Sequence, residues 1–252
     1  MLYAYKILQN ALTLLRIFGS SDLFITFTAN PAWTEIIDAL LPGQSASDRP
    51  DIVAHVFHLK CQSLLDDIVK RNVFGKTVAY VYTIEYQKRG LPHMHLIVFL
   101  HPSSQLSSPS RIDSFISAEF PDRDREPILF DVVTKFMVHG PCRQDQCLDG
   151  NGHCNKHFPN PFKETELSGE SYVKMKRRNT GQTYVVCGST VDNRMVIPYS
   201  PYLLRRYCAH INVECTTGLQ AIKYIYKVRI FSLYFTCIIS TLFFPTVCLQ
   251  RT

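Results

Sequence analysis

The most constraining feature of the chain is the apolar stretch Leu96 to Leu100, which directly follows His93-Met94-His95. A glycine and a proline stand in front of it, so the stretch predicts a buried strand that leaves a tight turn. Side chains alternate between the faces of a strand, so His93 and His95 point to one face and Met94 to the other. Two imidazoles on one face supply half of a divalent-metal site. A pair of structural histidines satisfied by hydrogen bonds is the alternative.

A second strand is predicted just before the histidines, because Thr77 to Gln87 is rich in β-branched and aromatic residues. The intervening turn would close a hairpin. Glu85 and Gln87 share a face and would offer an oxygen ligand beside the histidines, with Gln87, nearer the turn, as first choice and Glu85 as second. Two imidazoles and an oxygen, with positions left for phosphate oxygens, favour Mg2+ or Mn2+ in phosphoryl chemistry. Either side chain is otherwise a solvated hairpin residue.

Helices and strands follow one another in an irregular order along the rest of the chain. This order predicts an α+β fold with a central antiparallel sheet flanked by helices. The 252 residues suffice for one large domain, or for one domain with an appendage. The other expected elements are a strand at 22–28, helices at 8–18, 32–40, 51–69, 112–118, 127–137 and 219–227, and a basic hairpin formed by 172–176 and 183–187.

A Cys/His-rich loop lies within residues 136–160, with the spacing His139-x2-Cys142-x4-Cys147-x6-Cys154-x2-His157. The loop has few apolar residues, so burial cannot offset the entropy lost on ordering it, whereas a structural Zn2+ would do so. Three thiolates and one imidazole complete a tetrahedron. His139 and His157 compete for the fourth position, ahead of His153. Free cysteines in an ordinary loop are the alternative.

The chain has nine cysteines and no secretory signal pattern at its start. We therefore expect an intracellular protein, nuclear or cytoplasmic, whose cysteines are thiols or metal ligands. The six cysteines outside the loop show no ligand spacing and are expected to be packing residues.

The basic charge is concentrated in one part of the sequence. The net charge is +6, yet residues 170–229 alone hold ten lysines and arginines against three acids. Tyrosines are interleaved with these basic residues, and cations with stacking aromatics suit a surface that binds single-stranded DNA. A solvated charged face is the alternative. The predicted DNA contacts are Lys174, Lys176, Arg177, Arg178, Arg194, Arg205 and Arg206.

His93-Met94-His95 resembles the His-hydrophobe-His motif of rolling-circle replication nucleases. The wider sequence resembles the Rep domain of Helitron transposases, also called the Helitron helicase-like N-terminal domain. The similar stretches keep the family's order over most of residues 15–227. They are 22–33 (DLFITFTANPAW), 56–60 (VFHLK), 85–100, 137–142 (MVHGPC), 192–204, 209–214 (AHINVE) and 221–224 (AIKY).

The resemblance implies a single-strand DNA endonuclease and strand transferase that uses a tyrosine nucleophile. A phenolate attacks the phosphodiester while a metal ion stabilises the developing charge. The family pattern places the nucleophile at Tyr224, on a helix across the metal face. The family's second tyrosine, four residues on, is Val228 here, which puts two-strand transposition in doubt. Tyr226 lies too far round the helix to replace it.

The resemblance makes residues 1–227 one Rep-like nuclease domain and stops at the tail, residues 228–252. Between Arg229 and Arg251 the tail holds 21 uncharged residues. The tail is either a transmembrane helix or a segment translated past the end of an exon. Pro245 interrupts a helix and favours the second reading, so we expect no membrane partner unless that helix is genuine.

We expect an isolated, degenerate Rep domain that binds single-stranded DNA and, if intact, nicks it. The sequence contains no Gly-x4-Gly-Lys-Ser/Thr motif, so we expect no nucleoside triphosphate site and no helicase activity. The main alternative is a catalytically inactive DNA-binding transposon remnant. A zinc-stabilised interaction module without a DNA role is the third.

Overall fold

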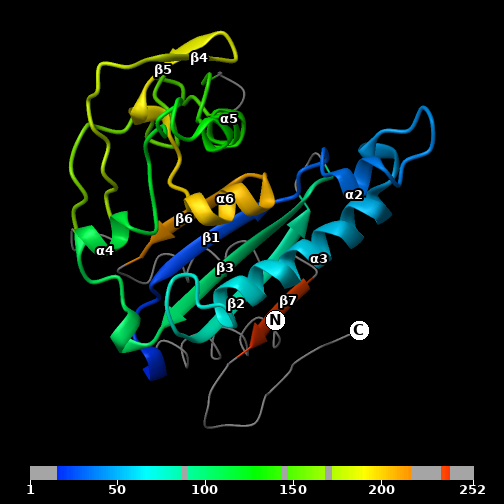
Figure 1. Ribbon diagram of the computed structural model, residues 1–252, viewed down its shortest axis with the longest axis horizontal. Coiled ribbons are helices and arrows are strands. Elements are labelled where there is room, and N and C mark those ends of the chain that lie inside the picture. The colour runs from blue at the N-terminus through cyan, green and yellow to red at the C-terminus, as the bar shows by residue number, and fades with distance from the viewer. Residues whose placement is uncertain (1–15, 87–89, 143–146, 168–171, 217–233, 239–252) are drawn as a thin grey trace.

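The computed structural model describes residues 16–86, 90–142, 147–167, 172–216 and 234–238 (Figure 1). Within them lie a five-stranded antiparallel sheet, in the order β6-β1-β3-β2-β7, and a separate two-stranded sheet, β4-β5. The strands are β1 (Leu23–Thr28), β2 (Thr77–Tyr86), β3 (Pro92–Leu100), β4 (Tyr184–Val186), β5 (Ser189–Val191), β6 (Ile211–Cys215) and β7 (Tyr234–Ile238).

The α-helices differ greatly in length, and the longest, α3, has twenty residues. Pro50 opens it, and Asp51 lies in its first turn, where a carboxylate interacts favourably with the helix dipole. The helices are α2 (Thr34–Ile37), α3 (Pro50–Val69), α4 (Pro109–Asp113), α5 (Pro127–Phe136) and α6 (Pro201–Tyr207). Short 3-10 turns are η1 (Ala46–Asp48), η2 (Pro102–Ser104) and η3 (Asn193–Met195).

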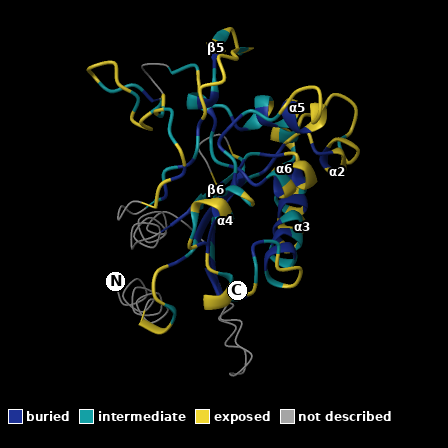
Figure 2. Cartoon of the chain, turned by 60° about the vertical axis from the view of Figure 1, so that its left-hand side comes forward, coloured by how far each residue is buried: buried dark blue, intermediate teal, exposed yellow. Residues whose placement is uncertain are grey.

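The main hydrophobic core lies between one face of the central sheet and the helices α3 and α6. Alternate residues of β1 and β3, including Ile25, Phe27, Met94 and Leu96, enter this core. They meet a stripe on α3 that recurs at helical spacing, including Phe57. Figure 2 shows the buried positions along the sheet and the inner side of α3. The opposite sheet face carries His93 and His95 at one end, and buried apolar residues such as Ile97 and Phe99 further along β3.

A second, smaller core lies above the sheet, where α5 meets α6. It is formed by Leu129, Val133, Met137, Val196, Tyr199 and Leu204. The buried Tyr199 hydroxyl donates to the backbone carbonyl of Glu119 (2.9 Å) and fastens the connection from α4. This second lobe also carries β4, β5 and the Cys/His-rich loop (Figure 1).

The predicted α+β class and antiparallel central sheet are confirmed, as are the β2–β3 hairpin, the β1 strand, α3 and α5. The predicted helix at 112–118 is wrong: α4 ends at Asp113, and Ser117 bridges to Tyr199 instead. The predicted helix at 32–40 shortens to the four residues of α2. The predicted helix at 219–227 lies outside the described residues, as does the predicted helix at 8–18 except for residues 16–18.

The predicted basic hairpin is also wrong. β4 pairs with the neighbouring β5, while residues 172–177 bridge to 163–166 and to Thr216. The apolar tail contributes an unexpected element, because β7 extends the sheet beside β2. Residues 234–238 are therefore a strand. Among the described residues, no helix has both the length and the apolar character that a bilayer crossing requires.

Candidate metal centres

The two histidines of β3 share one sheet face with residues of both neighbouring strands. Thr28 of β1 and Glu85 of β2 lie directly opposite His93, and Thr26 lies opposite His95. Thr83 of β2 is the fourth such neighbour, on the other side of His95. Paired residues of antiparallel strands point to the same face, so these four positions form a polar patch with the histidines. This face is the one that α3 and α6 leave uncovered.

Glu85, His93 and His95, here called the histidine site, bring their ligand atoms within 4.8 Å of one another. Nε2 of His95 lies 2.9 Å from Oε1 of Glu85, and the two imidazole centroids are 4.5 Å apart. Ligands on one small divalent ion lie about 3 Å apart, given bonds of about 2.0–2.1 Å. Two nitrogens and a carboxylate oxygen at these separations fit such an ion with small side-chain rotations.

The surroundings keep both imidazoles neutral, which is the form that binds a metal. Burial lowers the pKa of His93 to about 3, with further lowering by His95 and His210. Burial also lowers the pKa of His95, against an opposing effect of its contact with Glu85. Their exposed fractions are only 7% and 2%. Phe24 stacks against His95 and covers one face of its ring.

Thr28 fixes the ring of His93, because its Oγ1 lies 2.6 Å from Nδ1. If Nδ1 carries the proton, it donates to Thr28 and leaves the Nε2 lone pair for a ligand. Sequence reasoning missed Thr28. The signal was present, since Thr26 and Thr28 alternate with the apolar Ile25 and Phe27 in β1 and so belong to the histidine face.

The polar patch continues onto β6, which sequence reasoning also missed. The Thr28 N–H donates to the backbone carbonyl of His210 (3.0 Å), and Asn212 lies opposite Thr26. Buried side-chain atoms of both residues, Nδ1 of His210 and Oδ1 of Asn212, have no hydrogen-bond partner within the described part of the chain. The patch thus spans four strands, from Glu85 to His210.

Two predicted residues of this site lie outside the described residues. They are Gln87, the first choice for the oxygen ligand, and Tyr224, the predicted nucleophile. Both stay predictions.

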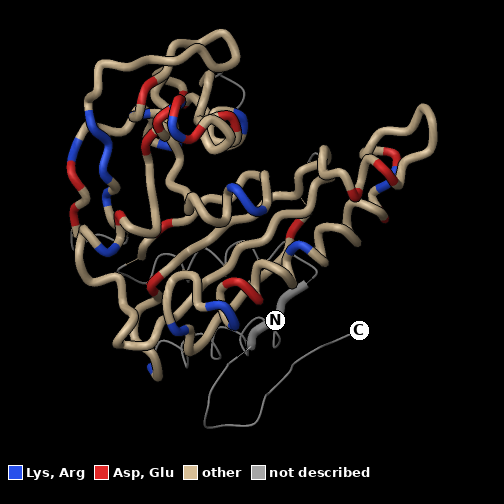
Figure 3. The backbone as a smooth tube through the Cα atoms, in the orientation of Figure 1, with Lys and Arg blue, Asp and Glu red and all other residues tan. Residues whose placement is uncertain are grey.

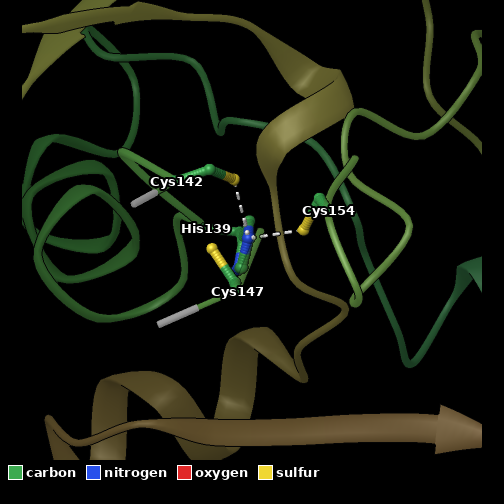
Figure 4. A group of neighbouring side chains, drawn as sticks. All are labelled: His139, Cys142, Cys147 and Cys154. Carbon is green, nitrogen blue, oxygen red and sulfur yellow. Dashed lines mark hydrogen bonds between the residues drawn. The ribbon is translucent and has the colours of Figure 1, made fainter. Parts of the chain in front are cut away.

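The Cys/His-rich loop brings four side chains together (Figure 4). Nε2 of His139 lies 3.3 Å from the sulfur of Cys142 and 3.2 Å from that of Cys154. The ligand atoms of these three residues and of Cys147 all lie within 4.8 Å of one another. We call His139, Cys142, Cys147 and Cys154 the cysteine cluster.

The other two histidines of the loop are not part of the cysteine cluster. His157 is exposed and has a left-handed backbone (φ 59°). His153 is exposed and faces Asp149, with Nδ1 and Oδ2 3.9 Å apart. Of the competing candidates for the fourth position, only His139 is placed among the thiols.

The three thiols differ in their electrostatics. Burial raises the pKa of Cys142 to about 12, helped by its contacts with Cys147 and Cys154. Burial acts in the same direction at Cys154, but backbone N–H groups of Phe158 and Lys156 and the neighbouring thiols outweigh it, so its pKa is lowered. The Lys156 N–H donates to the Cys154 sulfur at 3.3 Å. Cys154 is therefore the thiol best prepared to be a thiolate.

The predicted DNA-contact residues are largely engaged within the protein. Arg178 holds Glu119 in a fork of contacts down to 2.6 Å, and Arg177 is buried and donates to two backbone carbonyls. Four more pair with acids: Lys176 with Asp113, Arg194 with Asp192, Arg205 with Glu126 and Arg206 with Asp67, all at 2.8–2.9 Å. Figure 3 shows acidic positions interleaved with the basic ones. The DNA contacts of these residues stay a prediction.

Comparison with known proteins identifies the first part of the chain. Residues 2–98 match the family model described as the Helitron helicase-like domain at the N-terminus. The match ends within β3, just after the two histidines, so it includes all three residues of the histidine site. A search of the curated proteins finds no match. The predicted resemblance is confirmed over this segment, and the similarity of the later stretches stays a prediction.

Proposed function

We propose that this chain, which carries a Helitron helicase-like N-terminal domain, is a single-strand DNA endonuclease and strand transferase that uses a divalent metal and a tyrosine nucleophile. The observation that carries the proposal is the histidine site. Its two imidazoles and one carboxylate converge on the polar face of an antiparallel sheet, inside the segment that matches the family.

The donor set of the histidine site fits Mg2+ or Mn2+. Two neutral imidazoles with one carboxylate leave positions for phosphate oxygens, whereas a thiolate-rich set would favour softer ions. His93, His95 and Glu85 would hold the ion, which when bound polarises the scissile phosphate and stabilises its developing charge. Thr28 orients His93 through Nδ1. Gln87, the first choice from the sequence, lies outside the described residues and stays the alternative oxygen ligand.

The nucleophile that we propose is Tyr224. Its phenolate oxygen attacks the phosphorus of a DNA phosphodiester, and the bond from phosphorus to the 3′ oxygen of the preceding nucleotide breaks. The products are a 5′-phosphotyrosine and a free 3′-hydroxyl, which takes up a proton. Attack of a 3′-hydroxyl on the phosphotyrosine reverses these steps and transfers a strand.

One assay tests the proposal. The full chain is incubated with labelled single-stranded DNA and Mn2+, and covalent adducts are separated on a denaturing gel. We expect an adduct with the wild type and none with Tyr224→Phe or His95→Ala. Tyr226→Phe is the matched control, because it removes a neighbouring phenol that has no role in the proposal, and it should keep the adduct.

The outcomes separate the proposal from its main alternative. DNA retention on a filter without any adduct, in Mn2+ and in Mg2+, would show an inactive DNA-binding remnant. An adduct that persists in Tyr224→Phe but is lost in Tyr226→Phe would show that the nucleophile is Tyr226 and that the proposed Tyr224 is wrong. Neither retention nor an adduct would overturn the DNA role.

A further inference from the structure

The cysteine cluster has the composition and spacing of a closed metal site. Zinc bonds of about 2.3 Å to sulfur and about 2.0 Å to nitrogen place the ligands of a tetrahedron roughly 3.5–3.8 Å apart. The four ligand atoms of the cluster already lie within 4.8 Å of one another, and His139 approaches two sulfurs at 3.2–3.3 Å. We infer that the cysteine cluster binds one structural Zn2+.

The donor set distinguishes this site from the histidine site. Three sulfurs and one imidazole favour Zn2+ over the hard ions Mg2+ and Ca2+. Four protein ligands complete a tetrahedron and leave no open position for substrate, so the ion is structural. The inference therefore does not depend on the proposed nuclease activity, and either can fail alone.

Contacts around the ligands prepare them for a metal. The ring of His139 stacks on Phe158 (centroids 4.3 Å apart), which holds its orientation. The Lys156 N–H donates to the sulfur of Cys154, which favours a thiolate there. His157, the competing ligand in the sequence, is exposed and outside the cluster.

The ion would join the loop to the second lobe. On one side the His139 N–H donates to the carbonyl of Met195 (2.8 Å), and on the other the Asn160 N–H donates to the carbonyl of Arg194 (3.0 Å). Both contacts end on η3. Between them most described loop residues are exposed or half-buried, and Cys147 is the most buried. Since burial contributes little there, coordination supplies the order of the loop.

Metal content and thiol reactivity test the inference on the full chain purified without chelator. We expect about one zinc per chain by elemental analysis, and a near-ultraviolet sulfur-to-metal charge-transfer band after exchange with Co2+. The three cluster thiols should react with a thiol reagent only after a chelator is added. Cys154→Ser should lose the zinc and the band.

Three variants serve as controls. His157→Ala should keep the zinc, because this imidazole lies outside the cluster, and Cys187→Ser, at an exposed cysteine, should keep it too. His95→Ala should also keep the zinc, which separates this site from the histidine site. Zinc retained in Cys154→Ser but lost in His95→Ala would overturn the assignment.

A local readout guards against loss caused by misfolding of a variant. Chelation of the wild type should release the loop, so that trypsin cleaves after the exposed Lys156 at least about tenfold faster than before, while cleavage elsewhere stays slow. Re-addition of Zn2+ should restore protection. A protein that contains no zinc, shows no cobalt band and has all cluster thiols reactive from the start would refute the inference, as would iron in place of zinc.

Discussion

Thr28→Val isolates the contribution of a single hydrogen bond to the histidine site. Valine keeps the branched shape of threonine but removes the Oγ1 that lies 2.6 Å from Nδ1 of His93. A buried N–H left without its acceptor costs about 1–3 kcal/mol. The imidazole must also hold its Nε2 towards the ion, and loss of such an orienting partner typically weakens metal binding by about 10–100-fold.

We therefore expect Thr28→Val to weaken Mn2+ binding by about 10–100-fold, or roughly 1.4–2.7 kcal/mol. Calorimetric titration of the full chain with Mn2+ measures the affinity directly. If nicking occurs, its rate in the variant should recover at saturating Mn2+, because the hydrogen bond acts through the metal and not on the DNA.

The matched control is Thr26→Val, two residues earlier on the same strand and face. Thr26 is also buried, at 8% exposed, and lies opposite His95. Thr26→Val should change Mn2+ affinity by less than about twofold, since among the described residues the Thr26 hydroxyl forms no hydrogen bond to an imidazole. Equal losses in both variants, or an unchanged affinity in Thr28→Val, would refute the orienting role.

Two further predictions concern stability. Burial raises the pKa of Asp22 to about 6, although the hydrogen bond that the carboxyl accepts from the Leu100 N–H opposes the shift. The protonated carboxyl therefore contributes stability below pH ~4, and this contribution is lost as the pH rises towards 6. In urea unfolding, Asp22→Asn should gain about 1–2 kcal/mol at pH 7, after allowance for solvent screening, and little at pH 4, whereas a loss at pH 7 would contradict this. Tyr207→Phe removes a 2.6 Å hydrogen bond to the buried Asp67 and should lower the free energy of unfolding by about 1.5–3 kcal/mol. Tyr202→Phe is the matched control, because the Tyr202 hydroxyl lies 3.5 Å from the same residue, and it should cost under about 0.5 kcal/mol. Similar costs for the two variants would reject a special role of the buried contact.

Local patterns in the sequence were sufficient for the elements that form the histidine site. The β2–β3 hairpin has a short turn and two apolar strands, and α3 has an apolar stripe at helical spacing, so each could be predicted from neighbours in the chain. β6 was missed although Ile211, Val213 and Cys215 alternate with polar residues. Its partner, β1, lies far away in sequence, and a five-residue alternation is a weak signal without that partner.

The ligand set of the loop illustrates a different limit. Spacing alone left His139 and His157 as equal candidates, because both lie within three residues of a cysteine. The choice depends on tertiary contacts: His139 is held against Phe158 and Met195, whereas His157 points to solvent. Such contacts join the end of α5 to η3, and no local pattern encodes them.

The basic segment shows why a local charge excess is a poor measure of a binding surface. Residues 170–229 carry far more cations than anions, but their partners Asp67, Asp113, Glu119 and Glu126 come from earlier parts of the chain. The carboxylate in such a pair offsets the charge of the cation and occupies part of its donors, so the pair attracts a phosphate less strongly than a free cation does. Any DNA affinity of this lobe should therefore be weaker than the sequence excess predicts, and it should depend less steeply on salt because fewer phosphates are neutralised.

The register of the sheet is what turns the spacing of these residues into chemistry. His93 lies beside Glu85 on one side and Thr28 on the other only because β2, β3 and β1 pair as they do. A shift of one residue in β1 would move Thr28 into the apolar core and present Phe27 to the histidines. The hydrogen bond from the Leu100 N–H to the Asp22 carboxyl opposes that shift, because it joins the start of β1 to the end of β3. A carboxyl that lowers stability at neutral pH thus helps to keep the metal ligands and their orienting hydroxyl on one face.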